Sequence, residues 1–78
     1  MVDVKKVLYD LVCAIVEEPQ GVTIDEAVED STVTLTLHVA EGDMGKVIGR
    51  HGKIANALRT VLKAAGNLNG QKVVVEIE

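Results

Sequence analysis

The sequence has very few aromatic residues and little cysteine. It contains no Trp, no Phe and a single Tyr, together with one Cys and one Pro, among 78 residues. One cysteine excludes an intrachain disulfide. Because Cys13 lies within an apolar helical pattern, we interpret it as a small core residue in a reducing compartment rather than as a reactive thiol. The lone Tyr9 excludes a binding surface made of several stacked aromatic rings.

Patterns typical of enzymes, metal sites and membrane spans are also missing. His38, His51 and Cys13 have no spacing that suggests zinc, and no nucleophile–base pair or pair of carboxylates is apparent. No apolar run approaches the roughly 20 residues of a membrane-spanning helix, and the early Asp3 argues against a signal peptide. We therefore expect a cytoplasmic protein that is not an enzyme, with no catalytic residue, no metal, no cofactor and no membrane contact.

The length fits one domain, residues 1–78, without a repeat or a low-complexity segment. A core of this size is marginal. It is built on fourteen Val residues without Phe or Trp, so each side chain buries a modest area. Association would bury more surface, and we therefore expect a dimer.

The charge is unevenly distributed along the chain, although the net formal charge is only −4. Residues 1–43 carry two basic and ten acidic side chains, a balance of −8. Residues 44–75 carry six basic side chains and no acidic one, before Glu76 and Glu78 close the chain. A tract of one sign indicates a surface for an anionic partner. The alternative is a solvated helix face without a partner.

Hydrophobic periodicity predicts a helix and two strands in the first half of the chain. Apolar residues recur at helical spacing over residues 4–16. Residues 22–29 are predicted to form a strand whose inward face includes Val28 but is interrupted by Glu26, as a bulge or an edge position would explain. Residues 32–39 alternate strictly between apolar and polar, and the short polar turn before them predicts an antiparallel hairpin.

Two further helices are predicted in the second half. Asp43 is positioned to cap a short helix over residues 44–48. A longer helix begins at Ile54, and its C-terminal cap is expected at Gly66. One face of this helix is expected to carry Ile54, Ala57, Leu58, Val61, Leu62 and Ala65 into the core.

A last strand over residues 72–78 completes the order α-β-β-α-α-β. Because a helical crossover joins it to the strand at residues 32–39, these two strands are expected to pair in parallel through a right-handed connection. The sequence therefore predicts an α+β fold with a three-stranded mixed sheet, covered on one face by three helices.

The stretch GKVIGRHGKI, residues 45–54, lies between the last two helices and is the strongest functional signal. Its three glycines permit unusual backbone conformations and close approach of a ligand. A helix that starts just after it directs free N–H groups and a positive dipole end at that ligand. A Walker A loop and a dinucleotide fingerprint are excluded, because Val47 stands where each requires glycine. A phosphate backbone is the expected ligand.

The run from Val47 to Ile54 resembles the I-G-x-x-G-x-x-I signature of KH domains, and the whole chain resembles the small bacterial stand-alone KH proteins of the KhpA type. The resemblance implies a type II KH fold and a GXXG loop that clamps a short stretch of single-stranded RNA. It also implies a role as RNA chaperone or post-transcriptional regulator, with a homodimer or a heterodimer with a larger KH-containing protein of the Jag type. The residues that it implies in RNA binding are Gly45, Lys46, Ile48, Gly49, Arg50, His51, Gly52, Lys53 and Ile54.

Several assignments stay open on the sequence alone. Val47, Ile48 and Ile54 can build the core, floor a groove for bases, or do both. Arg59 and Lys63 share one helix face and either extend the phosphate path or only solvate the helix. A protein-interaction module with a vestigial glycine loop is the alternative function, and single-stranded DNA is the alternative ligand.

Overall fold

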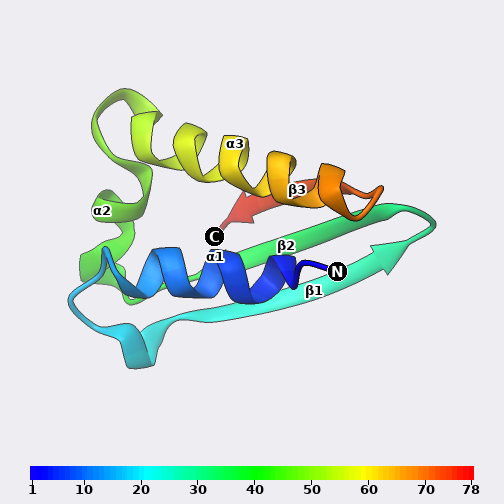
Figure 1. Ribbon diagram of the computed structural model, residues 1–78. Coiled ribbons are helices and arrows are strands. Elements are labelled where there is room, and N and C mark those ends of the chain that lie inside the picture. The colour runs from blue at the N-terminus through cyan, green and yellow to red at the C-terminus, as the bar shows by residue number, and fades with distance from the viewer.

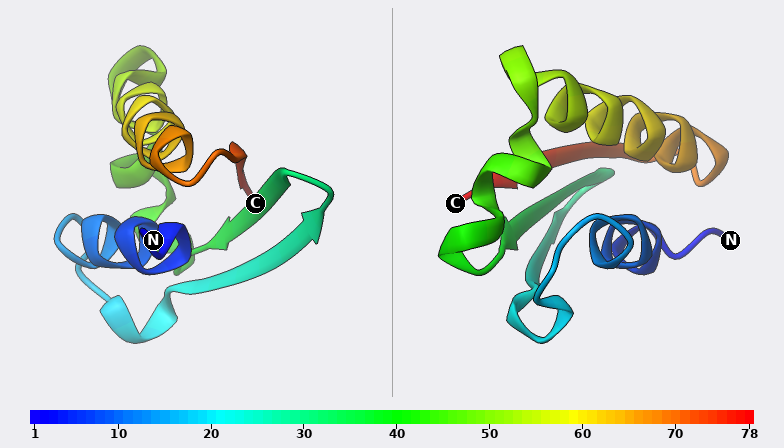
Figure 2. Two further views of the ribbon diagram at one scale, coloured as in Figure 1. Left: turned by 45° about the vertical axis from the view of Figure 1, so that its right-hand side comes forward. Right: turned by 90° about the vertical axis from the view of Figure 1, so that its left-hand side faces the viewer.

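The computed structural model describes residues 1–78 and has the α+β order predicted from the sequence (Figure 1). Its helices and strands are α1 Val4–Cys13, β1 Thr23–Glu29, β2 Thr32–His38, α2 Met44–Ile48, α3 Lys53–Leu68 and β3 Lys72–Ile77. Three short 3-10 turns are Pro19–Gly21, Glu41–Asp43 and Arg50–Gly52. The helices lie on one side of the sheet, as predicted, and the other side is open (Figure 2). No helix is both long enough and apolar enough to cross a membrane.

The sheet has the order β1-β2-β3, so β1 and β3 are its edges. β1 and β2 are antiparallel, and β2 and β3 are parallel, which confirms the predicted hairpin and crossover. The register between β1 and β2 is continuous, so Glu26 lies on an edge strand without a bulge. The prediction that Val28 points into the core is wrong, since the residue is 60% exposed. This end of the hairpin extends beyond α1 (Figure 1).

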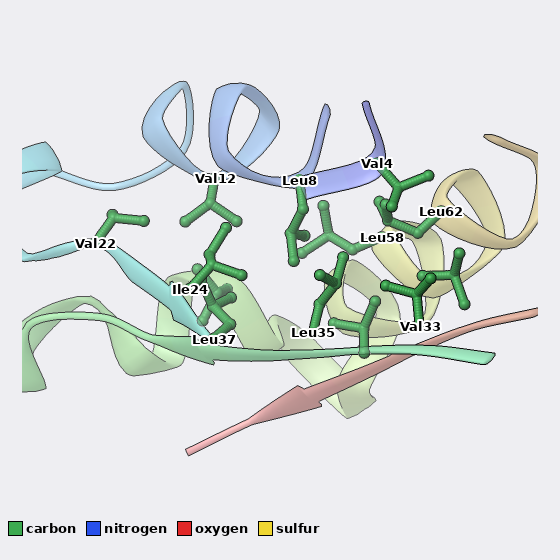
Figure 3. Close-up of a cluster of buried hydrophobic side chains, with 13 residues drawn as sticks. Val4, Leu8, Val12, Val22, Ile24, Val33, Leu35, Leu37, Leu58 and Leu62 are labelled. Atoms are coloured by element: carbon green, nitrogen blue, oxygen red, sulfur yellow. The ribbon is translucent and has the colours of Figure 1, made fainter. Parts of the chain in front are cut away.

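One hydrophobic core fills the space between the sheet and the helices (Figure 3). Leu8 of α1, Leu35 of β2 and Leu62 of α3 are completely buried in it. Its members are Val4, Leu8, Val12, Val22, Ile24, Val33, Leu35, Leu37, Val47, Leu58, Leu62, Val73 and Val75. Val47 is the member that α2 contributes, so the core fixes the short helix that leads into the glycine stretch.

The first helix begins at a capping side chain and is shorter than predicted. The carboxylate of Asp3 accepts the backbone N–H of Lys6 at 3.1 Å. The helix ends at Cys13. Residues 14–16 form a turn, in which the backbone N–H of Val16 donates to the carbonyl of Val12. Cys13 is half-buried and packs against the core, in agreement with its interpretation as a structural residue.

Asp43 occupies the N-cap position of α2, but the prediction that its side chain caps the helix is wrong. Its side chain makes no capping hydrogen bond to α2. Instead, Oδ1 accepts the backbone N–H of Glu17 and Oδ2 accepts that of Glu18, each at 3.0 Å. The residue is only 2% exposed. Asp43 therefore links the connection between α1 and β1 to the start of α2. This contact joins segments that are distant in the sequence, so no local pattern predicts it.

The last helix differs from its prediction at its end and on its surface. Gly66 lies inside α3 rather than at its cap. It is buried against β3, and a larger residue does not fit there, because a Cβ would lie 2.5 Å from Val73 Cγ2. The C-cap is Asn69. Ala57 and Val61, predicted on the buried face, are exposed. The fully buried residues of α3 are Ala55, Leu58, Leu62 and Gly66, and Ile54 and Ala65 pack half-buried against the core, as predicted.

Candidate nucleic-acid interface

The glycine loop, residues 49–52, turns the chain between α2 and α3. The φ angle is 75° at Gly49, 57° at His51 and 73° at Gly52, so only Arg50 among the four avoids the left-handed region. The N–H of Gly49 donates to the carbonyl of Gly45 at 2.9 Å, and that of Gly52 donates to the carbonyl of Gly49 at 3.2 Å. The loop is therefore a defined turn whose backbone conformation favours glycine at both ends.

The two loop glycines are needed for different reasons. A Cβ at Gly49 would lie 2.6 Å from Ile54 Cγ1, so a side chain there would displace Ile54. A Cβ at Gly52 would have open space, with Asn56 Nδ2 at 4.0 Å, and only the backbone conformation restricts this position. Gly45 also faces open space, with nothing within 4 Å. Backbone at Gly45 and Gly52 is therefore accessible to a ligand.

The basic residues around the loop are not equivalent. Arg50, His51 and Lys53 are exposed and take part in no ion pair. Lys46 Nζ, in contrast, lies 3.4 Å from a carboxylate oxygen of Glu17 and 3.9 Å from one of Asp43. The positive charge of Lys46 is thus shared with two carboxylates, whereas the charge of the loop itself is uncompensated.

The glycine loop is followed directly by the N-terminus of α3. Gly52 is the N-cap residue and provides no side-chain hydrogen bond to the helix. The 16 residues of α3 direct the positive end of their dipole at the loop. A helix N-terminus without a side-chain cap, beside unpaired cations, is suited to bind an anion such as a phosphate group.

Apolar side chains flank the loop on both sides. Val47 is completely buried, so among the three residues left open by the sequence it belongs to the core alone. Ile48 is 39% exposed, and Ile54 is half-buried against Gly49. Ile48 and Ile54 therefore supply an apolar surface next to the loop.

Arg59 and Lys63, whose roles the sequence leaves open, differ in their contacts. Its Nε donates to the carbonyl of Val75 at 3.2 Å, and its Nη1 donates to Asn56 Oδ1 at 3.5 Å. Lys63, one turn further along α3, is exposed and forms no ion pair. Arg59 is therefore held in place between α3 and β3, and only Lys63 fits the description of a solvated side chain.

The family model for the KhpA/KhpB KH domain matches residues 5–77. The chain belongs to the KhpA/KhpB family of KH domains. A relative from Clostridium perfringens is 42% identical over 73 residues, which are 94% of this chain and 97% of that protein. A relative from Clostridium acetobutylicum is 44% identical with the same coverage, and one from Listeria monocytogenes is 37% identical over 94% of this chain and 96% of its own.

Each of these relatives is named RNA-binding protein KhpA. Membership in the family confirms the resemblance seen in the sequence and the KH-like α+β fold. KhpA/KhpB is a family of KH domains and not of enzymes, which confirms the expectation that the chain is not an enzyme. The role of these nine residues in RNA binding stays a prediction. Support is weakest for Lys46, because its charge is shared with Glu17 and Asp43.

Proposed function

We propose that the protein binds single-stranded RNA and that the glycine loop clamps the phosphate backbone of the RNA. The observation that carries this proposal is the loop itself, a turn with two glycines at positive φ at the uncapped N-terminus of α3. The loop contains the unpaired Arg50 and is followed by the unpaired Lys53. The name of the relatives favours RNA over single-stranded DNA as the ligand.

Each part of the site has its own task in this proposal. Backbone N–H groups at the start of α3 and the guanidinium of Arg50 bind phosphate oxygens. The missing side chains of Gly45 and Gly52 leave open space in which the RNA backbone approaches the loop closely. Ile48 and Ile54 support the bases of roughly four nucleotides, the usual footprint of a KH domain. Binding is dominated by the backbone, so its dependence on base sequence is modest.

The salt dependence of binding tests the electrostatic part of the proposal. A loop that contacts three to four phosphates predicts a slope of log affinity against log salt of roughly −2 to −3, at about 0.7 per phosphate for single strands. Fluorescence anisotropy with a short single-stranded RNA at several salt concentrations measures this slope. A slope near zero contradicts the role assigned to the basic residues.

A protein-interaction module with a vestigial loop is the alternative function. It is favoured by the exposed apolar residues of α3, which no other part of the chain covers. Filter binding with mixed cellular RNA discriminates between the two functions. The proposed function requires RNA to be retained by the protein, and the alternative requires that none is.

In the cell, we propose that the protein acts in the cytoplasm as an RNA chaperone or post-transcriptional regulator. A clamp that holds a short unpaired stretch by its backbone favours single-stranded over paired conformations of many different RNAs, which is the behaviour needed for such a role. The partner expected from the family resemblance is a larger KH-containing protein of the Jag type. The joint name KhpA/KhpB of the family model is consistent with such a pair.

We further propose that the protein forms homodimers through the outer stripe of α3. This stripe consists of Ala57, Val61, Ala64 and Leu68, which recur at helical spacing. Val61 is 45% exposed and Leu68 is 79% exposed. A second copy on the stripe removes this apolar area from water. It also brings two glycine loops into one particle, which increases the avidity for a single RNA strand.

Changing Val61 to Lys is expected to convert the dimer to a monomer, because the charge would be buried between the two copies. The thermal midpoint at low protein concentration should change little, since Val61 is exposed in one copy. Sedimentation velocity at high micromolar concentration measures the change. Val28→Lys is the matched control, because Val28 is exposed to a similar degree on β1. A wild-type protein that sediments only as a monomer overturns the proposal.

A further inference from the structure

Arg59 occupies the unpaired edge of β3. The backbone N–H groups of Lys72 and Glu78 donate toward β2, to the carbonyls of Ser31 and Leu37. Because successive peptide groups of a strand point in opposite directions, the odd-numbered residues of β3 direct theirs at the free edge. The carbonyl of Val75 lies on that edge and accepts the Nε–H of Arg59 at 3.2 Å. The side chain thus reaches from α3 to the free edge of the sheet.

A row of polar groups connects this position to the glycine loop. Arg59 Nη1 donates to Asn56 Oδ1 at 3.5 Å. The amide nitrogen of Asn56 lies 4.0 Å from the point where Gly52 would carry a Cβ. From Lys53 to Arg59 the helix advances about 9 Å, at 1.5 Å per residue. An RNA strand whose phosphate is held at the loop therefore has a base of a neighbouring nucleotide within reach of Arg59.

The guanidinium of Arg59 retains unused donors in a fixed orientation. An arginine side chain has five N–H donors, and the contacts to Val75 and Asn56 use two of them. Arg59 is exposed, and no carboxylate pairs with it. A planar donor group held at two points and otherwise free is suited to recognise a partner with two adjacent acceptors.

We propose that Arg59 is a specificity-determining residue of the RNA site and that it favours cytosine or guanine at one position of the bound strand. This inference rests on the proposed RNA binding and adds a base preference to it. Unpaired bases expose their full edges. Guanine presents the adjacent acceptors O6 and N7, and cytosine presents O2 and N3. Adenine and uracil place a donor beside each acceptor on these edges, so neither offers such a pair.

Two simpler roles for Arg59 make different predictions. A plain phosphate-attracting charge would act equally on all RNA sequences, and a structural brace of β3 would act on stability alone. Arg59→Lys separates the three roles, because lysine keeps the positive charge but lacks the planar fork. Lys63→Gln is the matched control, since Lys63 lies one turn further along α3 and makes no ion pair.

The test is fluorescence anisotropy at one fixed salt concentration with four RNA octamers: oligo-A, oligo-U, oligo-C, and oligo-U with two central guanines. The wild-type protein is expected to bind the last two about tenfold more tightly than the first two, as one bidentate contact provides. Arg59→Lys should reduce this preference to about twofold or less and leave the affinity for oligo-A and oligo-U unchanged. Lys63→Gln should preserve the preference.

Results that reject only the role of Arg59 differ from the result that also rejects RNA binding. Equal affinity of the wild-type protein for all four octamers overturns this inference and leaves the proposed RNA binding intact. The same holds if Arg59→Lys weakens all four equally, or if it lowers the thermal midpoint and preserves the preference. A wild-type protein that binds none of the octamers removes the proposed function and the inference together.

Discussion

Replacing Asp43 by Ala is expected to lower the thermal midpoint of unfolding by on the order of 10 °C. The residue is 2% exposed, and its two carboxylate oxygens accept the backbone N–H groups of Glu17 and Glu18. Without the carboxylate these donors lose their partners in a partly buried environment, which is more destabilising than the loss of an exposed hydrogen bond. The connection between α1 and β1 would then detach from α2, the helix that leads into the glycine loop.

Thermal denaturation followed by circular dichroism measures this effect. Glu41→Ala is the control, because Glu41 lies in the same 3-10 turn and is exposed. An exposed substitution of this kind changes stability by no more than about 0.5 kcal/mol. Equal midpoints for the two variants would contradict the structural role assigned to Asp43.

The stabilisation by Asp43 should depend on pH. The hydrogen bond from the backbone N–H of Glu17 lowers the pKa of Asp43, burial opposes this, and the N–H of Glu18 and the charge of Lys46 lower it further. Since the pKa is lower in the folded than in the unfolded state, the stabilisation is fully present above the unfolded pKa, about 3.9. It is lost as the pH falls through the folded pKa. The midpoint difference between wild type and Asp43→Ala should therefore be constant near neutral pH and shrink below about pH 4.

The order of elements could be predicted because it follows from local periodicity. Strict alternation along β2 and helical spacing along α1 each identify an element without knowledge of the rest of the chain. Asp43 and Gly66 could not be interpreted correctly in this way. Local rules place an aspartate before a helix or a glycine near its end as caps. Their observed partners, the N–H groups of Glu17 and Glu18 and the side chain of Val73, come from other segments.

In the candidate site, too, local features could be predicted from the sequence and contacts between distant segments could not. The glycine loop and its position before a helix could be predicted, because glycine spacing and basic flanks are local features. The ion pairs of Lys46 and the contact of Arg59 with Val75 depend on tertiary structure, so the sequence did not distinguish these side chains from other surface cations. Apolar spacing on α3 likewise does not reveal that Val61 lies outside the core.

Changing Arg50 and His51 together to Asp is expected to abolish RNA binding, with a loss of affinity of at least about a hundredfold. Both side chains belong to the glycine loop and neither forms an ion pair. The substitution removes the guanidinium and sets two carboxylates beside the N-terminus of α3. Phosphate groups would then be repelled at the place where the helix dipole and backbone N–H groups attract them.

The double substitution should leave the fold intact. Both residues are exposed, and aspartate adopts the left-handed conformation of His51, with φ at 57°, more readily than most residues. Lys5→Asp combined with Gln20→Asp is the matched control, because it makes the same change in formal charge at exposed positions outside the loop and α3. Substitution of Gly49 would be a poorer test, since a Cβ there would displace Ile54 and disturb the loop itself.

The most direct measurement is the affinity of the Arg50→Asp, His51→Asp protein for a short single-stranded RNA, taken on the same preparation as its thermal midpoint. We expect the affinity to fall at least about a hundredfold with a nearly unchanged midpoint, while the charge-matched control binds within a few-fold of wild type. If the double variant keeps both its affinity and its midpoint, the glycine loop does not bind the RNA backbone, and the mechanism proposed for this protein is wrong.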